Sequence, residues 1–105
     1  MTQEVHSYEY GGLGLRVRRL SEDQIAEYAR LVDEHEAGNI DSNSVGAAMF
    51  SLCLVGDDGG PLLPTPETAL TWMAVFSQRL HGWMIGKVIA TNPDIEPLVM
   101  RAGLR

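Results

Sequence analysis

Residues 45–55, VGAAMFSLCLV, form an uncharged apolar run that decides how the rest of the chain is arranged. On a helical frame, one face carries apolar side chains at i, i+3, i+4 and i+7 spacing: Val45, Ala48, Met49, Leu52 and Val55. Phe50 and Leu54 lie on roughly the opposite face. Because a helix that is hydrophobic all round must be covered on both sides, the run predicts the central helix of a mainly α fold.

The end of this run allows a second interpretation, because short apolar segments are ambiguous by periodicity alone. Leu52 to Val55 could form a strand, with the GDDGGP sequence that starts at Gly56 turning the chain into Leu62-Leu63. Neither interpretation gives the run any catalytic side chain, so we expect a packing and binding protein.

The composition of the 105 residues is that of an ordinary globular protein, and we expect a single domain over residues 1–105. The net charge of −6 is uneven, because residues 1–60 hold eleven acidic against four basic side chains. This excess disfavours nonspecific nucleic-acid binding, which depends on Lys and Arg neutralising phosphates. The only basic cluster, Arg16, Arg18 and Arg19, is too small to reverse that expectation.

The sequence also bears on where the protein works. The longest apolar run is shorter than the ~18 residues that a membrane-spanning helix needs, so we expect no membrane association. The first residues, MTQEVHSYEY, lack a basic start followed by an apolar block, which predicts that there is no secretory signal. The lone cysteine, Cys53, cannot form an internal disulfide and fits a reducing compartment as a small buried hydrophobe.

Residues 4–19 predict a β-hairpin, because EVHSYEY and LGLRVRR alternate with period two around Gly11-Gly12. If those glycines form the loop, Tyr10 pairs with Leu13, and the pairing continues from there to His6 and Val17. One face is then apolar and the other polar. An isolated hairpin is marginal in water, so this one must lie on the helices or pair with another chain.

The first helix has a clear start and a clear stop. Ser21 and Gln24 have the spacing of a capping box, and Ala37-Gly38-Asn39 predicts the end. Asp41, Ser42 or Asn43 can cap the central helix, which follows directly.

The third helical region starts at Thr65-Pro66 and must stop at Asn92-Pro93. A break near Ser77 or Gly82 predicts either two helices or one bent helix over 66–91. The tail, residues 93–105, predicts one short docked turn. The expected fold is therefore mainly α: a hairpin over 4–19, then three or four helices packed around the central one, with the helical core spanning 21–92.

No pattern in the chain indicates an enzyme, a metal site or a cofactor site. His6, His35 and His81 are scattered, and no two of them have the i, i+4 spacing of helical metal ligands. The Asp57-Asp58-Gly59 sequence lacks the alternating oxygens and closing Glu of a calcium loop. No glycine-rich phosphate loop follows a strand. We therefore expect a protein without catalytic residues or cofactors.

A second stripe on the third helical region is the best candidate for a binding site. Trp72, Phe76 and Trp83 share one side of the helical frame, with Arg79 and Lys87 alongside. Aromatic and Arg side chains dominate many protein interfaces, although aromatic residues at helical spacing also fill cores. Because the apolar arc is wider than one core contact requires, we expect these five residues to bind another copy or a helical partner.

The order of features resembles the small tail assembly chaperones of long-tailed bacteriophages. A short β segment leads into RVRRLSEDQIAEY, an apolar helix runs into LCLVGDDGGPLLPTPETAL, and the last helical region ends at IATN. The likeness covers residues 15–92. It departs from the pattern at Leu63, where an aromatic is common after the turn, and in the aromatic-rich stretch from Trp72 to Trp83.

The resemblance implies a non-enzymatic protein of the host bacterial cytoplasm that coats the tape measure protein and helps to recruit tail tube subunits. It also implies absence from the finished virion and a longer, frameshifted form. An excess apolar face suits a chaperone of a hydrophobic client, and homo-oligomers are expected. Two alternatives remain open: a structural head–tail connector or minor virion protein, and an acidic inhibitor that mimics nucleic acid through residues 22–58.

Overall fold

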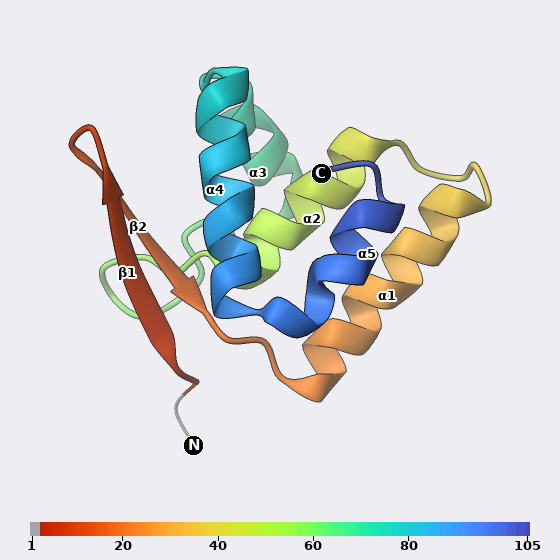
Figure 1. Ribbon diagram of the computed structural model, residues 1–105, viewed down its shortest axis with the longest axis horizontal. Helices are drawn as coiled ribbons and strands as arrows, with labels where there is room; N and C mark the ends of the chain where they lie inside the picture. The colour runs from red at the N-terminus through yellow and green to blue at the C-terminus, as the bar shows by residue number, and fades with distance from the viewer. Residues whose placement is uncertain (1–2) are drawn as a thin grey trace.

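The computed structural model describes residues 3–105, and within them a two-stranded antiparallel hairpin precedes a compact group of five α-helices (Figure 1). The fold is mainly helical, as predicted. The elements in chain order are β1 (Val5–Tyr10), β2 (Leu13–Arg18), α1 (Glu22–Glu36), α2 (Ser42–Cys53), α3 (Pro66–Met73), α4 (Gln78–Thr91), the 3₁₀ turn η1 (Pro93–Ile95) and α5 (Glu96–Arg101).

Helix α2 lies in the middle of the helical group (Figure 1), and its central part is buried on every side. Every residue from Val45 to Phe50 is buried. Helix α1 contributes the fully buried Tyr28 and Val32 to the same core, and α3 contributes Ala69. The prediction of a central apolar helix is confirmed.

The end of α2 corrects the predicted range of 45–55. The helix stops at Cys53, and Leu54 is extended, with φ −86° and ψ 137°. The backbone N–H of Val55 donates to the carbonyl of Arg16 at 2.9 Å, and Val55 also bridges Pro61. The strand interpretation was therefore correct for Leu54 and Val55. In the extended conformation these residues pair with the backbone of β2, which they could not do as part of α2.

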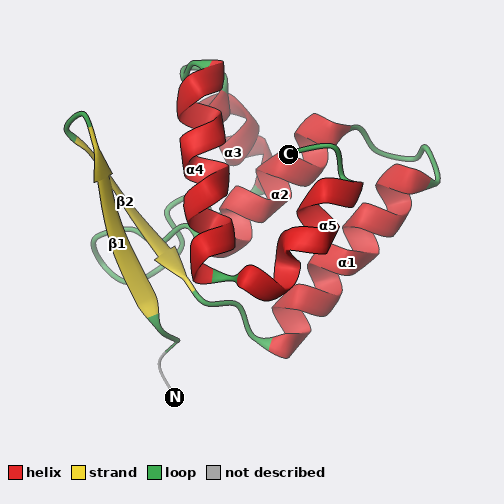
Figure 2. Cartoon of the chain, viewed as in Figure 1, coloured by secondary structure: helices red, strands yellow, loops and turns green. Residues whose placement is uncertain are grey.

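The hairpin has the predicted register, with Tyr10 opposite Leu13 and His6 opposite Val17. Gly11 and Gly12 both have positive φ, 54° and 87°, which is the backbone that a tight two-residue hairpin loop requires. The hairpin lies at one side of the molecule, outside the helices (Figure 2). The apolar side chains of its inner face contact α4. The hairpin therefore lies on the helices, which was one of the two arrangements expected for it.

The predicted helix starts are also confirmed. Ser21 and Gln24 form a reciprocal capping box, Asp41 caps α2, and Thr65 caps α3 with Pro66 in its first turn. Region 66–91 is two helices, because Ser77 accepts the N–H of Leu80 and starts α4 as a new cap. The tail forms η1 and α5, which is longer than the predicted single turn.

A buried asparagine joins the hairpin to the end of α4. Asn92 is 0% exposed, and its Oδ1 accepts the backbone N–H of Leu20 at 2.7 Å. Its Nδ2 donates to the carbonyls of Arg18 and Val88 at 3.1 and 3.3 Å. Every polar atom of this side chain is therefore used, and the exit of β2 is fixed against α4.

Replacing Asn92 should destabilise the fold strongly. Asn92→Ala leaves the buried N–H of Leu20 without a partner, and we expect the free energy of unfolding to fall by roughly 2–3 kcal/mol. Urea denaturation measures this loss. Asn39→Ala is the control, because Asn39 is exposed and its amide bonds only to Glu34; it should change stability by less than about 0.5 kcal/mol. Equal effects of the two variants would contradict this role of Asn92.

A substitution of Tyr28 should raise the free energy of unfolding instead of lowering it. Its ring is fully buried, and its hydroxyl has no hydrogen-bond partner among residues 3–105. Tyr28→Phe removes this unsatisfied group and should raise the free energy of unfolding by roughly 1 kcal/mol in urea denaturation. Tyr8→Phe should instead lower it by about 0.5–1.5 kcal/mol, because the Tyr8 hydroxyl bonds to Thr91 at 2.8 Å. A loss of stability in Tyr28→Phe would show that its hydroxyl is satisfied.

Candidate protein-binding surface

The break between α3 and α4 divides the five predicted binding residues between two places. Trp72 and Phe76 lie on the α3 side of the break, with ring centroids 4.7 Å apart in an edge-on arrangement. Trp72 also meets the buried ring of Phe50 at 5.9 Å. Both Trp72 and Phe76 are half-buried, so these two rings extend the core cluster of α2 to the surface.

Trp83 and Lys87 lie under the hairpin instead. The ring of Trp83 packs against Tyr10 with a centroid distance of 5.3 Å, and Lys87 Nζ lies 5.3 Å from the centroid of Tyr8. A cation at this distance from an aromatic ring is attracted by its π system. The face of α4 that carries these two residues is therefore covered by the hairpin within the same chain.

Arg79 is exposed at the start of α4, separated from both aromatic groups. The single continuous stripe drawn on one helical frame is consequently absent from the fold. The apolar side chains of region 66–91 form two groups separated at Ser77. The group on the α3 side packs on α2, and the group on α4 packs under the hairpin. The half-buried pair Trp72 and Phe76 is the part that remains next to open surface.

A groove opens beside this pair, between α3 and the start of α4. We call it the α3–α4 groove; it holds about 330 Å³ and is lined by Asn43, Leu70, Met73, Ala74, Phe76, Gln78 and His81. A second cavity of about 190 Å³ shares Asn43, Met73, Gln78 and His81 with it. This second cavity continues the groove along α2 to Gly103 and Leu104 at the end of the chain.

The groove keeps its shape through polar contacts at the helix break. The Nε2 of His81 lies 2.7 Å from the carbonyl of Met73, to which it donates across the break. The side chain of Ser77 caps α4 at the same turn. Val75 stands at the tip of this turn with 75% of its surface exposed, and Leu70 on the groove wall is 39% exposed. The groove therefore has a mixed lining, with the exposed side chain of Val75 next to it in the chain.

Sequence analysis did not identify Val75, Leu70 or His81 as surface residues. Leu70 was not among the candidate binding residues, and His81 had no partner at ligand spacing. The available signal was Ser77, because a capping serine starts a new helix there and leaves residues 74–77 outside both helices. Val75, in this connecting segment, is exposed, whereas Phe76 is half-buried.

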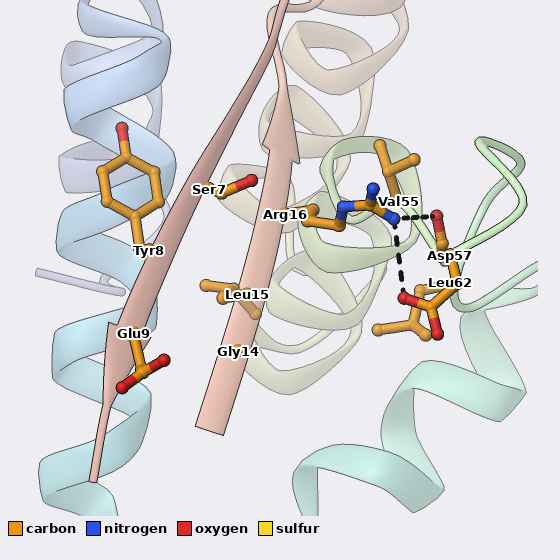
Figure 3. Close-up of a pocket in the computed structure, with 10 residues that line it drawn as sticks. Ser7, Tyr8, Glu9, Gly14, Leu15, Arg16, Val55, Asp57 and Leu62 are labelled. Carbon is orange, nitrogen blue, oxygen red and sulfur yellow. Dashed lines mark hydrogen bonds and ion pairs between the residues drawn. The ribbon is translucent and has the colours of Figure 1, made fainter. Parts of the chain in front are cut away.

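Another cavity lies between the polar face of the hairpin and the loop after α2 (Figure 3). It holds about 490 Å³, and Ser7, Glu9 and Arg16 line it on the hairpin side. Arg16 Nη1 donates to the carbonyl of Gly56 at 3.0 Å and lies 3.5 Å from a carboxylate oxygen of Asp57. Because its one cation is engaged by the loop, this cavity has fewer free groups for a partner.

No known protein family, curated protein or solved structure matches this chain. Within residues 3–105, no cluster of three or more His, Cys, Asp and Glu side chains could hold a metal ion. No helix in that same range is long and apolar enough to cross a membrane.

Two neighbouring substitutions test how the groove is built. Phe76→Ala removes half-buried ring packing against Trp72, and we expect it to lower the free energy of unfolding by roughly 2 kcal/mol. Val75→Ala should change that free energy by less than about 0.5 kcal/mol, because most of Val75 is already in water. Guanidinium denaturation of both variants measures the difference. A large loss in Val75→Ala would mean that Val75 belongs to the core.

Proposed function

We propose that this chain is a non-enzymatic phage tail assembly chaperone that binds the helical tape measure protein at the α3–α4 groove. The observation that carries the proposal is a pair of exposed apolar side chains, Leu70 and Val75, at a groove that Met73 and Phe76 also line. The resemblance over residues 15–92 supplies the identity of the client. It further implies that the protein recruits tail tube subunits and leaves before the virion is complete.

The chemistry of the groove suits an amphipathic helix. Such a helix lays its apolar face into a hydrophobic groove and is anchored by side chains one turn apart. Here Leu70, Met73 and Phe76 offer apolar contacts, and Asn43, Gln78 and His81 supply polar groups beside them. Protein interfaces usually combine apolar and polar contacts in this way.

The exposure of Val75 is unusual enough to need a reason. Single exposed apolar residues are common, but this one lies next to an open groove and the half-buried Phe76. Arg79 is exposed one residue beyond Gln78 of the groove and offers a cation to the client at its edge. We therefore assign the client contact to Phe76 and Arg79 among the predicted residues, with Val75 and Leu70 added.

The acidic residues give less support to the nucleic-acid mimic. Asp33 and Glu36 both bond to Arg101 of α5, and Glu27 bonds to Arg30 on the same helix. These hydrogen bonds hold the pKa of Glu27 and that of Glu36 below the ordinary range. Carboxylates that are paired within the chain present a weaker array to a basic partner than free ones.

Coexpression with a tape measure protein tests the proposal. The unaltered chain should raise the soluble fraction of that client, and Val75→Asp should abolish the increase by placing a charge at the groove. Met100→Asp is the matched control, because Met100 is 59% exposed on α5 and lines neither the α3–α4 groove nor the second cavity, and it should act like the unaltered chain.

Two results would contradict the proposal. If the unaltered chain does not raise the soluble fraction of the client, the proposed function is wrong. If Val75→Asp raises it equally, the groove is not the binding site. Mass spectrometry of purified particles separates the chaperone from a head–tail connector, because only a connector stays in the particle.

A further inference from the structure

Strand β1 has one free edge, and the hydrogen-bond pattern identifies the residues that face it. The N–H of Arg19 donates to the carbonyl of Glu4 at 2.7 Å, which fixes the alternation of the ladder. The even-numbered residues of β1 therefore bond to β2. Val5, Ser7 and Glu9 direct their backbone N–H and C=O groups away from β2.

The opposite edge of the hairpin is already occupied. The carbonyl of Arg16 on β2 accepts the N–H of Val55, and Val17 bridges Leu54. By contrast, no backbone hydrogen bond from Val5, Ser7 or Glu9 reaches another described residue. The two edges of the hairpin thus differ: residues 54–55 cover β2, and β1 is open.

The open edge lacks most of the features that protect a strand from pairing. Natural edge strands carry proline, a bulge, a covering loop or charged side chains, above all lysine. The segment VHSYEY has no proline or lysine and one acidic residue, Glu9, and its register with β2 runs without a bulge from Val5 to Tyr10. Val5 and Tyr10 are 43% and 42% exposed, and Ser7 and Glu9 between them are also exposed.

We propose that two copies of this chain associate through β1, in an antiparallel pair centred on Ser7. In this register Ser7 faces Ser7 of the second copy, and Val5 faces Glu9. The three outward-facing residues of each strand then find partners among the same three residues of the other. The two hairpins become one four-stranded sheet with the order β2-β1-β1-β2.

Charge and shape are compatible with this register. No two acidic side chains face each other, because Glu9 lies opposite Val5 and Glu4 opposite Tyr10. Centring the pair on Glu9 would instead oppose two carboxylates, which is destabilising. Centring it on His6 would pair Glu9 with Gln3, outside the strand. A twofold axis at Ser7 is therefore the register that pairs all three outward-facing residues of each strand, and a twofold axis is what a closed dimer requires.

The contact is small, so the dimer should be weak and transient. It is independent of the α3–α4 groove, which lies on α3 and α4, and it leaves client binding open. A chemical crosslink is the appropriate probe, because it captures a short-lived pair. The native thiol does not interfere: Cys53 is fully buried, and burial raises its pKa to about 12.

Disulfide trapping tests the proposal. Ser7→Cys places two thiols on residues whose Cα atoms would be about 5.5 Å apart in the paired strands, within the range of a disulfide. Under mild oxidation it should form a covalent dimer at least about tenfold faster than Thr71→Cys, an exposed control on α3. Equal rates for the two variants would overturn the proposal.

A mixed experiment tests the register. Val5→Cys and Glu9→Cys chains, oxidised together, should yield mainly the mixed dimer, whereas a parallel pair would favour each variant with itself.

Two substitutions of Ser7 test the interface itself. Ser7→Pro removes the outward N–H without touching the bonds to β2, and Ser7→Lys opposes two cations. A photocrosslinking probe that does not react with amines, placed at Tyr10, measures dimer formation in both variants. Both should lose the crosslinked dimer, and their circular dichroism spectra should stay unchanged. Persistence of the dimer in both variants would reject the β1 interface.

Discussion

The burial of α2 on all sides is the constraint on which the other elements depend. A helix without a polar face cannot border water, so each side of α2 needs a neighbour. Helices α1 and α3 cover two sides, and Leu104 at the end of the chain covers a third. Gly46 permits this last contact, because a Cβ at that position would lie 3.3 Å from a methyl of Leu104. The core is thereby filled within one short chain.

The way α2 ends connects this core to both candidate interaction surfaces. Because Leu54 and Val55 leave the helix extended, they run beside β2 and occupy its outer edge. The hairpin is then held from two directions, by this segment and by α4 beneath it. Its remaining edge is β1. Between α3 and α4, the break at Ser77 leaves Val75 exposed. It also separates Trp72 and Phe76, which extend the core, from Trp83, which packs under the hairpin.

Local signals in the sequence predicted most of the fold. Gly11-Gly12 set the hairpin register, and the caps at Ser21 and Thr65 set two helix starts, because each depends on neighbours within a few residues. The end of α2 was left open between a helix and a strand, since it is decided by a hydrogen bond to Arg16, far away in the chain. The candidate site was only partly predicted for the same reason. Phe76 borders the groove, but the cover of Trp83 by Tyr10 depends on tertiary packing that no helical frame shows.

The hydrogen bonds of the Asn92 side chain also determine when the hairpin can be covered during synthesis. The bonds to Arg18 and Leu20 span 74 and 72 residues, and the bond from Tyr8 to Thr91 spans 83. The inner face of the hairpin consequently has no cover until α4 has left the ribosome. Contacts between distant segments slow folding, because the loop must close before they form. A nascent chain would therefore carry the hairpin, with Tyr8 and Tyr10 uncovered, until the residues of α4 have been synthesised.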